Sequence, residues 1–256
     1  MSAITCGEAT ISLLEKYGVT TVFGIPGVHT LDFCRGLDDG VRHVQTRNEQ
    51  GAGFMAEGWA RATGEPGVAL VISGPGVTNA STALGQAYAD SLPVLLLSAE
   101  AASYTIGKGW GVLHEVTEQK KVTEPLTAFS ATAYRAADVP DLLARAFTVF
   151  RSQRPRPVHI SIPIDVQAEM VDATTLERDW QPREAAALPG PDPADIARSA
   201  ELLRTAKSPL LLVGGGAWRA GDALTRVAES CGAIVVASTA GKGIVADDHT
   251  FFALFV

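Results

Sequence analysis

The sequence predicts an α/β protein in which a parallel sheet carries helices on both faces. Segments with helical periodicity alternate with short apolar segments over the first 165 residues, as successive β–α units do. Residues 68–73 are apolar almost throughout, a pattern typical of strands that a parallel sheet buries on both faces. Turns rich in glycine and proline follow several strands, at the edge where α/β sheets bind ligands.

Periodicity and turn residues place the elements of the first half. Residues 7–17 carry an apolar stripe at helical spacing, and a glycine ends that helix. The apolar strand 21–25 is broken by a Pro-Gly pair, and a helix over about residues 30–37 follows. The alternating residues 41–45 form the next strand. A helix rich in small residues then runs from Glu49 to about residue 62.

The remaining elements complete a first domain at residues 1–168. After the strand 68–73 comes a Gly-Pro-Gly turn, and Thr78 or Asn79 is expected to cap the helix that runs from there to Asp90. The last elements are a strand at 93–98, a weaker strand at 129–134, an amphipathic helix at 139–150 and a final alternating strand at 158–162.

The rest of the chain divides into a linker and a second α/β unit. Residues 169–193 are rich in proline and charged side chains and lack periodicity, so they are predicted to be a linker. Residues 194–256 contain two helices and two strands, at 195–203, 210–213, 223–229 and 234–236. These pieces are too few for a self-sufficient domain. We therefore expect the second unit to be incomplete, the truncated start of a larger domain.

Composition excludes several classes of function. Hydrophobic residues make up 46% and charged residues 19%, so the chain can bury a core and is not disordered. A net charge of −7 without a basic cluster argues against a nucleic-acid partner. Cys6, Cys34 and Cys231 have neither disulfide nor metal-ligand spacing, so no metal site is predicted and the thiols are expected to be reduced. The absence of a signal peptide or an apolar run of membrane length predicts a cytoplasmic protein without a membrane partner.

Three loops at the carboxyl ends of three strands carry the candidate chemistry. Glu49 follows one strand and opens a helix, where an acidic residue also complements the helix dipole. Prolines and glycines shape the other two loops and let a ligand approach the backbone, around Pro26–Gly27 and around Pro75. Each feature alone is an ordinary turn or an ordinary first-turn acid. Their combination and spacing are specific.

Together the loops resemble the pyrimidine-binding (PYR) domain of thiamin-diphosphate-dependent enzymes, in particular the acetolactate synthase-like branch. The matching segments are residues 22–27, 47–52, 73–79 and 87–94. The resemblance covers essentially all of residues 4–165, and residues 195–256 resemble the start of that family's central domain.

The resemblance implies a catalytic role for Glu49. Its carboxyl group would hydrogen-bond N1′ of the aminopyrimidine of thiamin diphosphate and so promote removal of the C2 proton of the thiazolium. The resemblance also implies cofactor-binding residues around the aminopyrimidine, namely Pro26, Gly27, Val28, Pro75 and Asn79. The implied substrates are 2-oxo acids, in decarboxylation or carboligation.

Two residues depart from the acetolactate synthase pattern. Asn48 stands where a histidine commonly precedes the catalytic glutamate. His114 occupies the place of a glutamine near the reacting substrate, and it is the second catalytic candidate because histidine exchanges protons near neutral pH. A packing or capping role for His114 is the alternative. The change favours a 2-oxo acid decarboxylase of a related branch over acetolactate formation. The other histidines are expected to be structural: His29, His43, His159 and His249.

The resemblance places the rest of the cofactor site in another domain. In the family, a C-terminal domain with a Gly-Asp-Gly and an Asn-Asn motif holds Mg²⁺ and the diphosphate, and this sequence contains neither motif. The chain is therefore expected to hold half of the cofactor site and to be inactive alone. Because the PYR domain of one subunit meets the diphosphate domain of another, the resemblance also implies a homodimer or homotetramer.

Two alternatives remain open at this point. The glycine turn at residues 214–216 follows a strand but lacks the dinucleotide fingerprint. We expect a central domain without FAD, and FAD binding is the alternative. A non-catalytic subunit or interaction module that retains the PYR fold is the alternative function, and the three loops disfavour an unrelated nucleotide-binding α/β protein.

Overall fold

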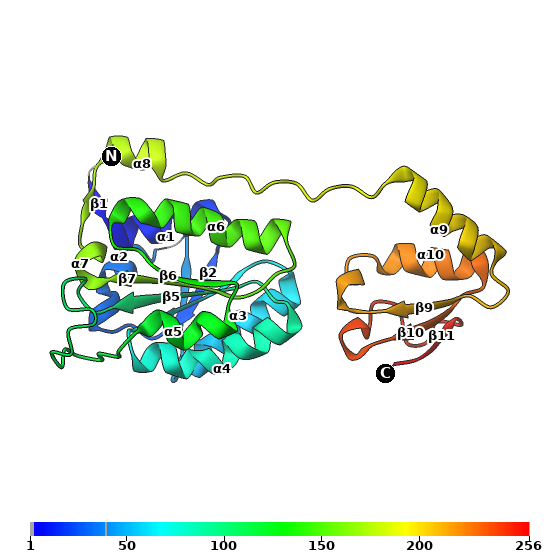
Figure 1. Ribbon diagram of the computed structural model, residues 1–256, viewed down its shortest axis with the longest axis horizontal. Coiled ribbons are helices and arrows are strands. Elements are labelled where there is room, and N and C mark those ends of the chain that lie inside the picture. Colours follow the sequence, from blue (N-terminus) through cyan, green and yellow to red (C-terminus); the bar gives the residue numbers. More distant parts are fainter. Residues whose placement is uncertain (1–2, 39, 256) are drawn as a thin grey trace. The chain divides into compact units, whose positions relative to one another are not determined.

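Six parallel strands form one sheet within the described part of the first 188 residues (Figure 1). The computed structural model describes residues 3–38 and 40–255; Met1, Ser2, Asp39 and Val256, which the predicted domains include, lie outside the described residues. The strand order is β3-β2-β4-β5-β7-β6, and every neighbouring pair is parallel. The predicted α/β class with a parallel sheet is therefore confirmed.

The elements of this first unit follow the predicted alternation of strands and helices. The strands of the sheet are β2 (Thr21–Gly24), β3 (Arg42–Gln45), β4 (Gly67–Val71), β5 (Val94–Glu100), β6 (Phe129–Thr132) and β7 (Val158–Pro163). The helices are α1 (Cys6–Lys16), α2 (Leu31–Arg35), α3 (Glu49–Thr63), α4 (Pro75–Asp90), α5 (Gln119–Thr123), α6 (Val139–Ser152), α7 (Ile164–Gln167) and α8 (Ala173–Asp179). A separate antiparallel pair consists of β1 (Ile4–Thr5) and β8 (Met170–Val171).

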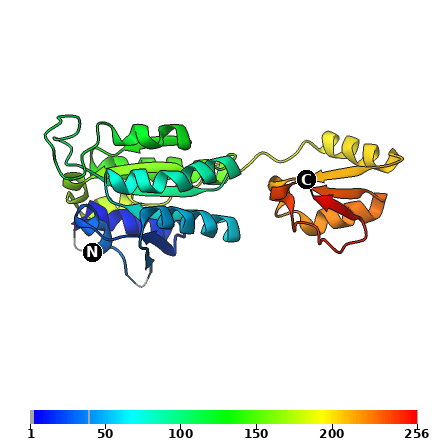
Figure 2. The ribbon, with the colours of Figure 1, turned by 90° about the horizontal axis from the view of Figure 1, so that it is seen from below.

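The sheet has a hydrophobic core on each face. Because successive residues of a strand point to opposite faces, Val68 and Leu70 of β4 enter the core that α1, α2 and α6 cover. Ala69 and Val71 enter the other core, with α3 and α4. Figures 1 and 2 show α1 and α6 on one side of the sheet and α3, α4 and α5 on the other. All five residues of β4 are buried, as the continuous apolar run predicts.

Small residues let α3 and α4 pack closely. A Cβ added to Gly53 would lie 2.7 Å from Cβ of Ala83 on α4, so a larger residue at position 53 would push the helices apart. Ala52 and Ala56 of α3 are fully buried in the same core. This packing sets the distance between the amino-terminal ends of the two helices, where two of the three candidate loops lie.

Two predicted helices begin or end elsewhere in the structure. α4 begins at Pro75, and Gly74 is its N-cap residue with a φ of 57°, so neither Thr78 nor Asn79 caps it. Proline suits the first helical position because the N–H that it lacks has no partner within the helix there. The predicted helix 30–37 is divided into the 3₁₀ helix η1 (Val28–Thr30) and α2, which ends at Arg35.

The first unit extends further along the chain than the predicted boundary at residue 168. β8 pairs with β1 through Ile4 and Val171, and Trp180 is 2% exposed in the first core. The carbonyl of Trp180 also accepts a hydrogen bond from Lys16 Nζ at 3.0 Å. The structure divides into Met1–Leu188 and Pro189–Val256, so only the end of the predicted linker at 169–193 lies beyond the first unit.

The second unit is a small α/β unit. It contains α9 (Pro193–Thr205), β9 (Leu210–Val213), the 3₁₀ helix η4 (Gly215–Ala217), α10 (Gly221–Cys231), β10 (Ile234–Ala237), the 3₁₀ helix η5 (Thr239–Gly241) and β11 (Phe252–Phe255). Its three strands are parallel in the order β11-β10-β9, and β11 was not predicted. Among the described residues, no helix combines the length and apolar character that crossing a bilayer requires.

Candidate functional site

The strand order brings the three candidate loops to one edge of the sheet. β2 lies between β3 and β4, and the strands are parallel, so the loops that follow them leave from the same edge. The loop after β3 leads into α3. There Asn48 is the N-cap residue, and its side chain accepts a hydrogen bond from the backbone N–H of Gln50 at 2.8 Å. Glu49 is the first residue of the helix, so the cap holds its backbone in place.

Glu49 and Asn79 meet directly at this edge. Nδ2 of Asn79 donates a hydrogen bond to Oε2 of Glu49 at 2.9 Å. Glu49 is half-buried and Asn79 is exposed, so the pair lies at the surface of the first unit. Among the described residues, Asn79 is the one hydrogen-bond partner of this carboxylate, and it uses only Oε2.

The loop after β2 presents its backbone and two exposed apolar side chains. The Thr30 side chain hydrogen-bonds both backbone polar groups of Gly27. Its Oγ1 accepts a hydrogen bond from Gly27 N at 3.0 Å and donates one to Gly27 O at 3.1 Å. A Cβ on Gly27 would lie 2.6 Å from Cγ2 of Ile72, just after β4, so the two loops are in contact. Pro26 and Val28 are exposed, Val28 to 75%. They share this edge with Glu49.

The loop after β4 passes under the segment that carries His114. Gly74 has a φ of 57°, and a Cβ there would lie 2.2 Å from the backbone oxygen of His114, so this position requires glycine. His114 itself has a φ of 59°, a conformation that few residues other than glycine adopt. Its Nδ1 is buried and has no hydrogen-bond partner, which among the described residues is true of no other buried side-chain nitrogen or oxygen. Pro75, the next residue after Gly74, is exposed.

The structure adds His29, for which the sequence predicted a structural role. The rings of His29 and His114 are perpendicular, with centroids 5.5 Å apart. Nδ1 of His29 and Oγ of Ser73 are 2.7 Å apart and share a hydrogen bond. Burial lowers the pKa of His29, and the neighbouring His114 lowers it further. The signal available in the sequence was the position of His29 in the same loop as Pro26 and Gly27.

A buried polar network supports the Gly74 turn from inside the sheet. The side chain of Gln119 accepts a hydrogen bond from Gly74 N at 2.7 Å and donates to Ser98 Oγ at 3.2 Å. Ser98 in turn hydrogen-bonds Nε2 of His159 at 2.8 Å, and Nδ1 of His159 is 2.7 Å from Oγ1 of Thr123. His159 is fully buried, and burial lowers its pKa to about 3, so the ring is neutral. The structural role expected for His159 fits this position.

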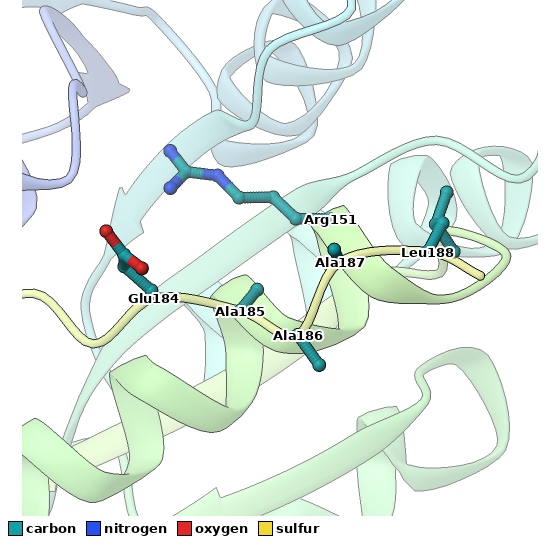
Figure 3. A pocket seen from close by; sticks show the side chains of 6 residues that line it. All are labelled: Arg151, Glu184, Ala185, Ala186, Ala187 and Leu188. Atoms are coloured by element: carbon teal, nitrogen blue, oxygen red, sulfur yellow. The ribbon is translucent and has the colours of Figure 1, made fainter. Parts of the chain in front are cut away.

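Among the pockets of the described residues, two in the first unit differ in position. One of about 350 Å³ is lined by Arg151 and residues 184–188 (Figure 3). Arg151 is near the end of α6, and the chain enters β7 from there, so this pocket is at the amino edge of the sheet, away from the candidate site. The other, of about 410 Å³, lies in the loop that carries His114 and is lined by Gly107, Lys108, Gly109, Glu115, Val116 and Thr117. The described residues contain no group of three or more His, Cys, Asp or Glu side chains that could hold a metal ion.

Comparison with protein families identifies the class of protein. A family model described as "Thiamine pyrophosphate enzyme, N-terminal TPP binding domain" matches residues 4–123, and one described as "Thiamine pyrophosphate enzyme, central domain" matches residues 196–256. The first match contains all three candidate loops and His114. The chain belongs to the thiamine pyrophosphate enzyme family.

Curated relatives in this family carry several activities in their names. The chain is 53% identical over 249 residues to a probable 2-ketoarginine decarboxylase of Pseudomonas aeruginosa. The matched region covers 96% of this chain and 44% of the relative. It is 34% identical to a glyoxylate carboligase of Escherichia coli O157:H7 (99% and 42%) and 36% identical to a probable acetolactate synthase large subunit of Methanocaldococcus jannaschii (94% and 41%). The chain thus spans less than half the length of these relatives.

Proposed function

We propose that the protein is a thiamin-diphosphate-dependent enzyme that decarboxylates a 2-oxo acid, with Glu49 as the carboxyl group that hydrogen-bonds N1′ of the cofactor. The observation that carries the proposal is the pair formed by Glu49 and Asn79 at the carboxyl edge of the sheet. This carboxylate is held from one side through Oε2 at 2.9 Å, and the pair lies at the surface. Both features suit a carboxyl group that binds a polar ligand atom.

The surroundings of Glu49 fit an aminopyrimidine ring. Gly27 is half-buried and has no side chain to cover its backbone, and Pro26, Val28 and Pro75 supply exposed apolar surface at the same edge. A flat ring with polar atoms at its rim would bind such a mixture of apolar surface and hydrogen-bonding groups. When bound, the cofactor supplies a nucleophilic carbon and accepts the electron pair that decarboxylation releases.

The residues of this chain would perform three tasks. Glu49 would hold a proton at N1′, and Asn79 would fix the orientation of its carboxylate. His114, which lies against the Gly74 turn, would donate or accept a proton near the reacting 2-oxo acid. Mg²⁺ and the diphosphate would be held by residues outside this chain, a homo-oligomer would complete the site, and the central domain would lack FAD.

Decarboxylation is preferred to carboligation for two reasons. His114 stands where the acetolactate synthase pattern has glutamine, and a relative at 53% identity is named as a decarboxylase. The name of that relative makes 2-ketoarginine the first substrate to test. A non-catalytic interaction module is the competing function, and the Glu49 and Asn79 pair favours the enzyme.

The test is CO₂ release by the full-length product of the gene that encodes this sequence, supplied with thiamin diphosphate and Mg²⁺. The substrates are 2-ketoarginine, pyruvate and glyoxylate. We expect CO₂ release from at least one of them, and its loss in Glu49→Gln but not in Glu65→Gln, a control at an exposed glutamate beyond the end of α3. No release from any 2-oxo acid, together with no binding of thiamin diphosphate, would support the interaction module instead.

A further inference from the structure

Glu100 is a buried carboxyl group that the proposed mechanism does not use. It is the last residue of β5, a central strand of the sheet, and it is 7% exposed. The residues Val94 and Leu96 of β5 enter the core beneath α3 and α4. By strand alternation Ser98 and Glu100 point to the same face, and Glu100 is one pleat closer to the carboxyl edge.

The contacts and register of β5 place Glu100 at the edge of the sheet that carries the candidate loops. Gln119 joins Ser98 Oγ and Ala99 O to the backbone N–H of Gly74. The 3₁₀ helix η1, which contains His29, packs against β5. β4 and β5 pair with Val71 opposite Ser98, so Ser73 and Glu100, each two residues further on, lie at the carboxyl ends of neighbouring strands. Ser73 is the residue that hydrogen-bonds His29.

The carboxyl group of Glu100 has no cationic partner in the described part of the chain. Its one hydrogen bond is from Ala101 N to Oε1, at 3.1 Å, and Oε2 has none. Oε2 is not completely enclosed, because Nδ1 of His114 is the one fully buried side-chain nitrogen or oxygen of the described residues that lacks a partner. Burial raises the pKa of Glu100 to about 7, and no neighbouring positive charge opposes this rise.

Two other carboxylates of this region are already occupied. Asp165, just after β7, accepts hydrogen bonds from Ser103 N at 2.8 Å and from Ser103 Oγ at 2.5 Å. Glu115 accepts from Gly109 N at 3.0 Å and from Gly111 N at 2.6 Å. Both hold loop backbone. Glu100 differs because one of its carboxylate oxygens, Oε2, has no hydrogen-bond partner among the described residues.

We propose, on the basis of the proposed function, that Glu100 determines substrate specificity by binding a cationic, guanidinium-type side chain of the 2-oxo acid. A buried carboxylate without a cation is costly, and a guanidinium would compensate it with a charge-assisted pair. The planar guanidinium can use both oxygens of one carboxylate. A substrate with an apolar side chain would leave that cost uncompensated, and an anionic one would be repelled.

The test compares two substrates of equal shape in the full-length enzyme. One is 2-ketoarginine, and the other is its neutral ureido isostere, 2-oxo-5-ureidopentanoate. In Glu100→Gln we expect kcat/KM to fall about a hundredfold or more for 2-ketoarginine, as for loss of one partner of a buried charge pair, and to change less than about threefold for the ureido acid. Glu118→Gln, at an exposed glutamate that pairs with Lys121, is the matched control and should leave both values unchanged.

A binding experiment separates this inference from the proposed function. The probe is 5-guanidinopentanoate, which has no 2-oxo group and cannot react. Calorimetric titration at pH 7 in buffers of different ionisation enthalpy should show proton release by the wild-type protein and none by Glu100→Gln. Glu100→Asp, which keeps the charge, should retain weaker binding and the proton release.

The outcomes are distinct. Equal losses for both substrates, or no loss for either, would overturn the role of Glu100 while the decarboxylase proposal stands. Turnover of neutral or anionic 2-oxo acids in preference to 2-ketoarginine would do the same. If no 2-oxo acid is decarboxylated, the proposed function fails, and the titration then decides whether Glu100 binds the guanidinium group.

Discussion

Asn79 donates a hydrogen bond from Nδ2 to Oε2 of Glu49 at 2.9 Å, and this contact joins the beginning of α4 to the first residue of α3. The two helices can approach because Gly53 lies against Ala83. The pair therefore depends on residues far from the carboxylate itself. It also leaves Oε1 without a hydrogen bond in the described part of the chain, which is the oxygen that we expect to face the cofactor.

Replacement of Glu49 tests the proposed proton relay. Glu49→Gln keeps the volume of the side chain and removes its ability to hold a proton. We expect the rate of hydrogen–deuterium exchange at C2 of bound thiamin diphosphate to fall about a hundred- to ten-thousandfold, the usual contribution of a general acid–base group. The measurement is quench-flow NMR on the full-length protein, with Glu65→Gln as control. An unchanged exchange rate would remove Glu49 from the mechanism.

Asn79 should act through Glu49. Asn79→Ala deletes a hydrogen bond to a charged group, which contributes about 1.5–3 kcal/mol, so we expect a fall of about ten- to a hundredfold in kcat. Asn79→Asp should be worse, because a second carboxylate would repel Glu49. Ser81→Ala is the control, since within the described residues the Ser81 hydroxyl donates its one hydrogen bond to the backbone oxygen of Thr78 on α4. Equal activity of Asn79→Ala and the control would show that Glu49 needs no such orientation.

The local hydrophobic pattern predicted the strands of the sheet well. It failed where a structural feature depends on contacts between residues that are distant in the sequence. Each predicted strand of the first unit is present, because alternation and apolar runs report burial directly. The predicted start of α4 was wrong because Gly74 forms the turn that precedes the helix. Gly74 lies there against the backbone of His114, some forty residues later in the chain. Trp180 was assigned to a linker because its neighbours are polar, although the first core buries it.

In the candidate site, too, local motifs were predicted and long-range contacts were not. The three loops were found because they are continuous motifs, but the partners of His114 were not. His29 contacts His114 from a loop some eighty residues earlier, where η1 packs against β5 and Ser73 hydrogen-bonds the His29 ring. Glu100 is one residue at the end of an apolar strand. Gln119 supports Gly74 from the first residue of α5, a five-residue helix that was not predicted. Such contacts are set by tertiary packing, which a single sequence does not display.

Gly74 should tolerate no side chain. An alanine at a positive φ costs about 1–2 kcal/mol, and its Cβ would also meet the His114 oxygen at 2.2 Å. We expect Gly74→Ala to lower Tm by several degrees and to reduce activity, because the chain must move at His114 or at Pro75. Gly58→Ala is a matched control on α3, where a Cβ meets nothing within 4 Å. That change should raise stability slightly, by about 0.5–1 kcal/mol. Differential scanning calorimetry measures both, and equal Tm values for the two variants would contradict the close approach.

The pH dependence of stability should reveal Glu100. Burial raises its pKa to about 7 in the folded protein, from 4.5 in a solvated chain, so the folded state retains a proton that the unfolded state has lost between these values. The contribution of Glu100 to the free energy of unfolding is therefore fully present below about pH 4.5 and is lost as the pH rises to about 7. His159 acts in the opposite direction, because burial lowers its pKa to about 3 and its contribution is lost as pH falls below about 6.5. The two trends overlap, so the wild-type curve alone cannot separate them.

The difference between wild type and Glu100→Gln isolates the carboxyl group, because His159 is the same in both. Glutamine keeps the shape and carries no charge, so we expect the variant to gain stability relative to wild type as pH rises from about 4.5 to 7, by up to about 3 kcal/mol. Denaturant unfolding at pH 4.5, 6 and 8 measures this difference, which should be larger at pH 8 than at pH 4.5. A saturating guanidinium ligand should reduce the difference at pH 8, because it stabilises the charged form in wild type only. A difference independent of pH would show that Glu100 ionises as an exposed carboxyl group does.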